Sequence, residues 1–253
     1  MKDFLQSISP KGKYGEFLKG KKVAVVGPSK HLLGSNLGKY IDSHDVVIRM
    51  KWENLLPLGH SWYAEYIVDI GSKTNVVYSA TAPLPTTREP NRRENVIRDC
   101  NRSKLDYFIV PSSRDNELFE EEKIGDHTTY VLYSSGPFAK EFARRMDTDQ
   151  LKIWPQTGFN AIMEAIASEA VEVFICGVTM YHGGGHMFQH NKPESHFKPV
   201  VKKHHGILEL DILKDCLDED KVKVDDALGW ILDNYKHFST KEVTKIIDNW
   251  TWV

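Results

Sequence analysis

The sequence predicts an α/β fold: a single domain over residues 1–253, built on a mostly parallel sheet with helices on both faces. Two observations predict it. Short apolar segments rich in β-branched and aromatic residues recur along the chain, and turn-forming residues flank them. Amphipathic segments long enough for helices lie between them, and strands that alternate with helices are typical of parallel sheets.

The elements follow in order along the chain. The expected strands are residues 21–27, 45–50, 75–80, 105–111, 128–133 and 171–177. The expected helices are residues 35–41 (a short one), 91–100, 137–146, 157–170 and 206–217. Residues 81–94 hold three prolines and little apolar periodicity, so we expect a loop there.

Composition, net charge and cysteine count limit the classes of protein to which this chain can belong. Hydrophobic residues make up 41% of the 253 residues, enough for a sizeable core. The formal charge of −2 gives no positive field for nucleic acid. No apolar run approaches the roughly 18–20 residues that span a bilayer, and the N-terminal segment is too polar for a signal peptide. Three widely spaced cysteines argue against a disulfide framework. We expect a soluble, cytoplasmic protein without a membrane span, or a protein of the Golgi lumen if an N-terminal anchor has been removed.

The segment VVGPSKHLLGSNLGKYIDSHDVVIRM, from Val25 to Met50, opens like a nucleotide-binding element. A buried strand ends at Gly27, but neither a lysine-bearing phosphate loop nor a three-glycine fingerprint follows. In an open parallel sheet, ligands bind at the carboxyl ends of the strands. The turn after Val26 is therefore a candidate phosphate or sugar site, although a plain connecting turn would have the same pattern.

The whole segment resembles the large sialyl motif of the animal-type sialyltransferases. The match runs without a gap and includes Gly27, Ser29 and the run from Ile41 to Asp45. Three later segments resemble the family's other motifs in the right order. They are PQTGFNAIMEAIASEAVEVFICG from Pro155 (small motif), HMFQ from His186 (third motif), and His204 with Glu209 (very small motif).

The resemblance implies a GT-A-like variant of the Rossmann-like fold and a defined reaction. An inverting, metal-independent transferase would move sialic acid, or a related keto-acid sugar, from a CMP-activated donor to a glycan hydroxyl. The CMP-sugar is a substrate, and no cofactor or metal is implied. A histidine suits the general base near neutral pH.

The resemblance also assigns site residues. His204 is the expected base, with its neighbour His205 as the alternative, and His186 is the expected partner of the departing phosphate. The expected donor contacts are Gly27, Ser29, Lys30, Lys51, Tyr78, Ser79, Thr157 and Gly158. The expected supporting residues are Asp42, His44 and Glu209. Thr157 and Gly158 begin a helix whose N–H groups suit an anion, but N-capping by Thr157 would explain the same pattern.

Departures from the family pattern concentrate in the nucleotide loop. Pro28 and Lys51 replace asparagines, and Lys30 replaces a glycine. Pro28 has neither a side-chain donor nor a backbone N–H, whereas a lysine could place an ammonium on the phosphate. The family's disulfide positions are Val23 and, depending on a one-residue gap, Ser168 or Glu169. Loss of both halves agrees with a reducing compartment.

Two other functions remain open from the sequence. A non-catalytic protein could keep the fold and only bind CMP or a glycan. A zinc enzyme is suggested by six histidines between residues 182 and 205, but three successive glycines make a metal-binding helix improbable there.

Overall fold

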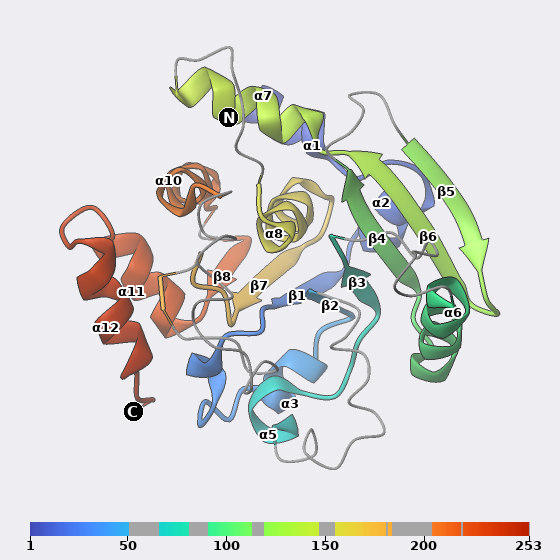
Figure 1. Cartoon of the computed structure of the whole chain (residues 1–253), viewed down its shortest axis with the longest axis horizontal. Helices are drawn as coiled ribbons and strands as arrows, with labels where there is room; N and C mark the ends of the chain where they lie inside the picture. Colours follow the sequence, from blue (N-terminus) through green and yellow to red (C-terminus); the bar gives the residue numbers. More distant parts are fainter. Residues whose placement is uncertain are drawn as a thin grey trace.

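The computed structural model describes residues 1–50, 66–80, 91–112, 119–146, 155–180, 182–183, 204–218 and 220–252. Within these residues, eight strands form one sheet in the order β5-β6-β4-β3-β2-β1-β7-β8, paired in parallel except β5 with β6 (Figure 1). The strands are β1 (Lys22–Val26), β2 (Val46–Met50), β3 (Val76–Tyr78), β4 (Tyr107–Ser112), β5 (Phe119–Ile124), β6 (Thr128–Ser134), β7 (Glu172–Cys176) and β8 (Val222–Val224).

Helices cover both faces of this sheet, as predicted (Figure 1). One face packs against α1 (Lys2–Ile8), α2 (Gly12–Leu18), α7 (Gly136–Met146), α8 (Thr157–Ala167) and α10 (Gly206–Cys216). The other packs against the 3-10 helix η1 (Lys30–Leu32), α3 (Gly38–Asp42), α5 (Ile67–Ile70) and α6 (Arg92–Ser103). Helices α11 (Asp226–Asn234) and α12 (Thr240–Asp248) follow the edge strand β8.

The central strand β1 shows why the sequence builds a three-layer fold. Val23 and Val25 belong to the core under α8, whereas Ala24 and Val26 belong to the core under α3. Successive side chains of a strand point to opposite faces, so an unbroken apolar run requires cover on both sides. The same burial applies to every residue of β2.

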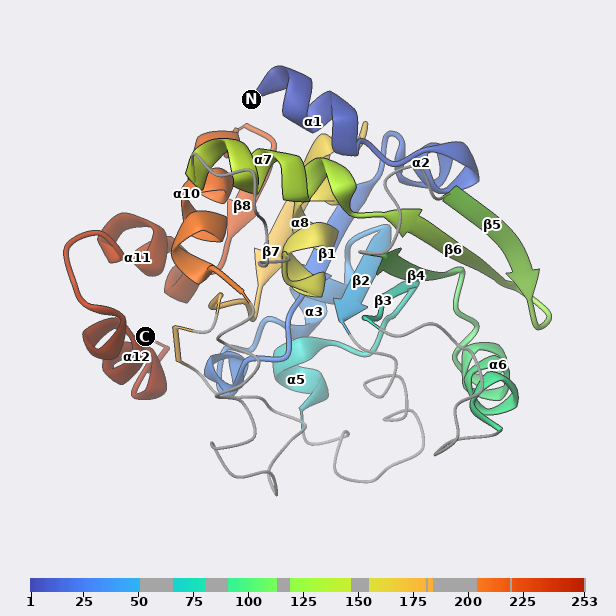
Figure 2. The same cartoon turned by 45° about the horizontal axis from the view of Figure 1, so that its top comes forward.

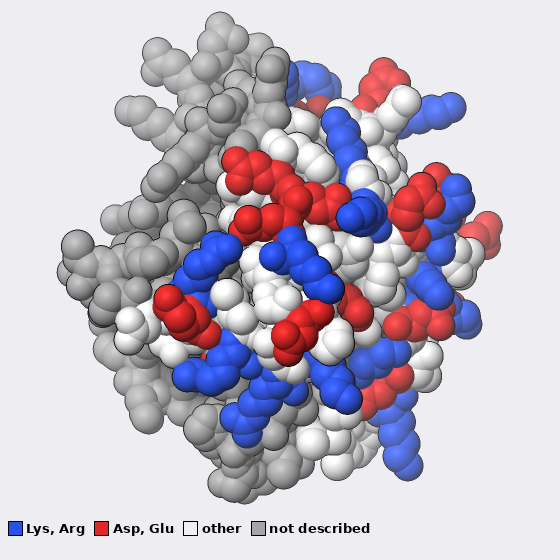
Figure 3. Space-filling view, turned by 90° about the vertical axis from the view of Figure 1, so that its right-hand side faces the viewer, with Lys and Arg blue, Asp and Glu red and all other residues white. Residues whose placement is uncertain are grey.

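The six predicted strands are confirmed, but β5 and β8 were missed. β8 has only three residues. β5 has the sequence FEEEKI, in which three glutamates replace the apolar alternation of a buried strand. An edge strand tolerates such charges because one side lacks a neighbour. Figure 3 shows acidic and basic side chains intermixed on this side of the molecule, where Arg93 on α6 pairs with Glu122 on β5 at 3.1 Å.

The helix predicted at residues 35–41 is wrong in extent: the described helix is α3, from Gly38 to Asp42. Gly34 and Asn36 have φ of +85° and +56°, which an α-helix does not accept. A 3-10 turn at Lys30–Leu32 precedes them. The polar segment after β1 therefore wraps around the carboxyl end of the strand before a helix begins.

A neutral polar network lies inside the core beneath α8. The Tyr78 hydroxyl donates to Glu164 Oε2 at 2.7 Å, and the Tyr14 hydroxyl lies 3.0 Å from that of Tyr78. Complete burial raises the pKa of Glu164 to about 8. The carboxyl group is therefore protonated near neutral pH, and the core holds no uncompensated charge there.

The strand order reverses between β1 and β7. From β1 the chain builds the sheet outward through β2, β3 and β4, and it later returns to place β7 on the other side of β1 (Figure 2). At this point a Cβ on Gly27 would lie 2.1 Å from the Gly177 carbonyl oxygen, and a Cβ on Gly177 would lie 2.5 Å from the Gly27 oxygen. Only glycine permits this backbone approach, and Gly177 also has φ +69°.

Replacing Gly27 by alanine should lower the free energy of unfolding by about 3 kcal/mol or more, because backbone rather than a movable side chain blocks the new methyl group. Urea unfolding measures the change. Gly229→Ala is the matched control, since its nearest neighbour would be 3.6 Å away and it lies within α11. That variant should gain about 0.5–1 kcal/mol. Equal stability of Gly27→Ala and the parent chain would contradict the close contact.

Candidate active site at the carboxyl ends of β1 and β7

The loop after β1 has few backbone donors left for a ligand. The Gly27 N–H donates to the Cys176 carbonyl at 2.8 Å, and the Ser29 N–H donates to the Gly177 carbonyl at 3.1 Å. Pro28 between them has no N–H. No backbone N–H of residues 27–29 is therefore left for a phosphate, and the side-chain candidates are the Ser29 hydroxyl and the exposed Lys30 ammonium.

The Ser29 side chain belongs to a buried hydrogen-bond chain. His31 Nδ1 lies 2.9 Å from Ser29 Oγ, and His31 Nε2 lies 3.0 Å from Asp225 Oδ2. The imidazole and the carboxylate are both fully buried. Asp225 also accepts the Gly177 N–H at 2.7 Å and caps α11 by accepting the Leu228 N–H at 2.7 Å. Asp225 thus links the loop after β1, the end of β7 and the start of α11.

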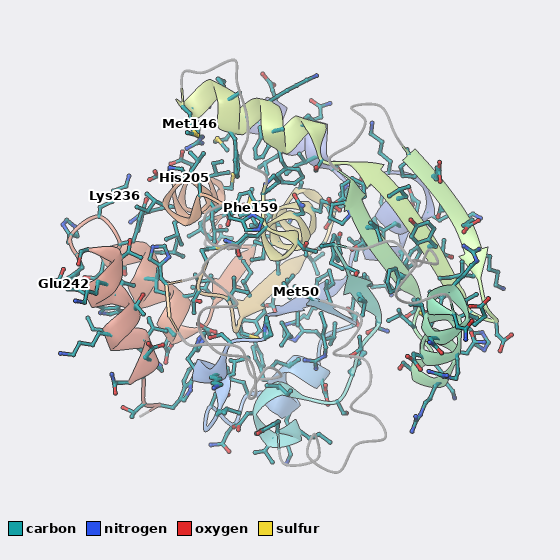
Figure 4. The ribbon with its side chains drawn as sticks, viewed as in Figure 1. Met50, Met146, Phe159, His205, Lys236 and Glu242 are labelled. Atoms are coloured by element: carbon teal, nitrogen blue, oxygen red, sulfur yellow. The ribbon has the colours of Figure 1, made fainter. Side chains whose placement is uncertain are left out.

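The N-terminus of α8 lies next to the carboxyl end of β2. A Cβ on Gly158 would meet the Met50 side chain at 3.5 Å, and Figure 4 shows Met50 below the helix that carries Phe159. The alternative explanation, N-capping by Thr157, does not apply. Gln156 occupies the N-cap position, and its side chain makes no capping hydrogen bond. The first turn of α8 therefore keeps the N–H donors that favour an anion.

Glu209 joins α10 to the start of α8. Its Oε1 accepts the Gln156 backbone N–H at 2.7 Å, and its Oε2 accepts from Gln156 Nε2 at 2.5 Å. Glu209 is fully buried, and burial raises its pKa to about 8. The supporting role predicted for Glu209 has this physical basis: it fixes the residues just before α10 beside the N-terminus of α8.

His204 and His205 immediately precede α10, and His205 is labelled in Figure 4. His205 is the N-cap: its Nδ1 accepts the Leu208 N–H at 3.1 Å. A neutral His205 in this role carries its proton on Nε2 and has its one ring lone pair engaged. It therefore cannot accept a further proton without losing the cap. His204, the expected base, has a half-buried side chain.

The remaining described site candidates lie in supporting positions. Tyr78 is fully buried with its hydroxyl on Glu164, and Ser79 follows at the end of β3, where its N–H donates to the Ile109 carbonyl. Asp42 accepts from the backbone N–H groups of Ser72 and Lys73, and so fixes the turn before β3. His44 lies near the start of β2, away from the carboxyl ends. Its Nδ1 donates to the Tyr40 carbonyl at 2.9 Å.

Two expected site residues, His186 and Lys51, lie outside the described residues, as do three of the histidines of the zinc hypothesis. Where the structure is described, no three His, Cys, Asp or Glu side chains form a metal-binding group. His182 is buried, and its Nδ1 lies 3.2 Å and 3.1 Å from the carbonyl oxygens of Thr179 and Met180. Burial lowers the His182 pKa, so the ring is neutral near pH 7.

Sequence reasoning missed His31, Gln156, Gly177 and Asp225. The glycine that ends the strand at residues 171–177 was one usable signal, and Asp225 before an apolar helical pattern was another. His31 and Asp225 are 194 residues apart, and no local pattern connects them.

Comparison with known proteins identifies the family. The profile of glycosyltransferase family 29 (sialyltransferase) matches residues 3–214. The chain therefore belongs to this family and is a glycosyltransferase of the sialyltransferase class. No curated protein sequence matches the chain.

Two solved structures are similar to this chain. A mammalian sialyltransferase in complex with Gal-beta-1-3GalNAc-ortho-nitrophenol is 18% identical, with a TM-score of 0.44; the match covers 88% of this chain and 77% of that chain. A second mammalian sialyltransferase structure is also 18% identical, with a TM-score of 0.47 and coverage of 88% and 76%. None of the helices among the described residues has the length and apolar character that a bilayer span requires.

The engagement of His205 in the helix cap gives a direct test of the base. Substituting His204 by alanine should lower the rate of sugar transfer by roughly 10²–10⁴-fold, the usual contribution of a general base. His205→Asn keeps a capping side chain and should retain transfer within a few-fold. Initial rates at saturating donor and acceptor decide between them. An active His204→Ala variant together with an inactive His205→Asn variant would show that His205, and not His204, is the base.

Proposed function

We propose that this sialyltransferase-family chain moves sialic acid, or a related keto-acid sugar, from a CMP-activated donor to a glycan hydroxyl with inversion. The observation that carries the proposal is the grouping of phosphate-binding and base candidates at the strand-order reversal. The Ser29 loop, the N-terminus of α8 and the residues before α10 are held together there through Gly177, Met50 and Glu209. Open α/β sheets bind nucleotides at such a point.

The donor phosphate is assigned to the positive and hydrogen-bonding groups of this region. The Ser29 hydroxyl and the Lys30 ammonium approach from the β1 loop, and the N–H groups of Thr157 and Gly158 from α8. Together they would stabilise the charge that develops on CMP as the glycosidic bond breaks. His186 and Lys51 complete the set as expected from the family motifs.

The chemical step is a single displacement. The acceptor oxygen forms a bond to the anomeric carbon while the bond from that carbon to the phosphate oxygen breaks. His204 takes the hydroxyl proton, and the electron pair of the broken bond leaves with CMP. Attack opposite the leaving group inverts the anomeric centre. Glu209 acts through position, since its carboxyl group holds the start of α10 against Gln156.

Neither a metal nor a further cofactor has a role in this proposal. The leaving group is a phosphate monoester anion, so one local charge has to be stabilised, and the groups named above can do so. We also propose a reducing, cytoplasmic location. The family's first disulfide position holds Val23, which is buried in β1. The second holds Ser168, whose hydroxyl donates to the Ala165 carbonyl, or Glu169. The cysteines present are free and buried.

The proposal predicts CMP release that depends on an acceptor. Purified chain with CMP-sialic acid and a lactose-type acceptor should form a sialylated product of inverted configuration. EDTA in roughly hundred-fold excess over the protein should leave the rate of transfer unchanged. Mass spectrometry measures the amount of product, and NMR measures its anomeric configuration. CMP binding without transfer or donor hydrolysis would indicate a binding protein. Loss of activity in EDTA that zinc or manganese restores would indicate a metal mechanism.

A further inference from the structure

The hydrogen-bond chain Ser29–His31–Asp225 determines the direction in which the Ser29 hydroxyl donates its hydrogen. Asp225 Oδ2 receives the Gly177 N–H and faces His31 Nε2, while Oδ1 receives the Leu228 N–H. A carboxylate that caps a helix and accepts these donors is itself an acceptor, so His31 Nε2 must carry a hydrogen. The protonation of Nδ1 is then the one variable left in the chain.

The two states of Nδ1 have opposite consequences for a ligand. With Nδ1 unprotonated, the Ser29 hydroxyl donates its hydrogen to the imidazole and offers a ligand only lone pairs. With Nδ1 protonated, the imidazolium donates to Ser29 Oγ, and the hydroxyl hydrogen is released for an anion. An anion bound at Ser29 Oγ needs the second state, because the hydroxyl can donate to it only when its hydrogen does not point at Nδ1.

We propose that His31 takes up a proton when the donor phosphate binds at Ser29, so that Asp225 and His31 turn the Ser29 hydroxyl from the imidazole to the phosphate. The inference rests on the proposed CMP donor. The proton comes from solvent, binds Nδ1, and returns to solvent when CMP leaves. His31 and Asp225 are thus positioning residues: they act on the ligand through Ser29.

The contacts of the His31 ring show which charges it faces. Asp225 is the charged side chain in contact with the ring. Lys30 on the same loop and Asp226 on α11 are exposed. Burial, together with Asp225, raises the pKa of the Cys176 thiol well above its usual value, so this thiol close to Asp225 stays neutral. The Trp252 ring lies 6.2 Å from the imidazole. One carboxylate therefore faces the ring, and an added anion supplies the second negative charge.

Residues beyond the family match hold the Ser29–His31–Asp225 hydrogen-bond chain in place. Asp225 and Trp252 both follow residue 214, where the match ends. Trp252 Nε1 donates to the His31 carbonyl at 2.5 Å, so the C-terminal segment fixes the backbone of the loop as Asp225 fixes its side chain. Figures 1 and 2 show the C-terminal end of the chain beside the segment after β1. The C-terminal helices thereby complete the donor site.

The test is calorimetric titration with CMP near pH 8, in two buffers of different ionisation enthalpy. At this pH the second ionisation of a free phosphate monoester, with a pKa of about 6, is complete. The parent chain should take up about one proton more per CMP than His31→Gln, whose amide cannot be protonated. The affinity of the parent chain for CMP should fall about tenfold per pH unit as the pH rises, as linkage requires when binding takes up one proton. His237→Gln, which removes an exposed histidine after α11, should behave as the parent.

A second variant removes the hydroxyl through which His31 acts. In Ser29→Ala, His31 Nδ1 has no hydroxyl to accept from or donate to. CMP binding by this variant should take up no proton at His31 and should lose the pH dependence. If either variant fails to fold, nitrogen NMR of the imidazoles in the parent chain replaces it. His31 should carry one ring hydrogen without CMP and two with it.

The outcomes separate the two proposals. CMP binding with the same proton uptake in the parent chain and His31→Gln, or a His31 ring doubly protonated with and without CMP, would overturn the inference and leave the donor assignment standing. A chain that does not bind CMP would overturn both.

Discussion

The backbone contact between Gly27 and Gly177 is the constraint on which the candidate site depends. The residues that follow two paired parallel strands limit how closely the backbone can approach beyond the strand ends. After β1 and β7 both of these residues are glycines, which have no Cβ. The Ser29 N–H bonds the Gly177 carbonyl, and the Gly177 N–H bonds Asp225. The position of the Ser29 hydroxyl, and of the imidazole behind it, follows from that contact.

The second half of the site depends on one buried carboxyl group. Glu209 bonds both N–H donors of Gln156 and holds the start of α10 against the start of α8. A Cβ on Gly206 would lie 2.5 Å from the Met180 carbonyl oxygen, so the same turn also packs against the segment after β7. The base candidate His204 is therefore placed relative to the N-terminus of α8 by packing and hydrogen bonds.

The sequence predicted the parts of the fold that carry their own signal. The six apolar strands and the helix at residues 157–170 have a periodicity that burial on one or two faces produces. β5 was missed because its glutamates reflect an exposed edge, and the helix after β1 was misplaced because the positive φ of Asn36 has no local signature in a polar segment.

The candidate site was predictable only where a motif is continuous. The family motifs located the loop after β1, the start of α8 and the histidines before α10. The helix cap made by His205 has no signal in the motif. The contact of His31 with Asp225 was not predictable, because Asp225 lies 194 residues away and is brought close by the return of the chain to β7, β8 and α11. Contacts of this kind arise from topology, and a single sequence does not reveal them.

The most direct test of the central claim is to map CMP on the protein by amide NMR during a titration. The largest shifts should fall on Ser29, His31, Gly158 and Gly177, at the carboxyl ends of β1, β2 and β7. The amides of β5 and α6, at the far edge of the sheet, should not move. Saturable shifts confined to that edge, or to the amino ends of the strands near His44, would contradict it.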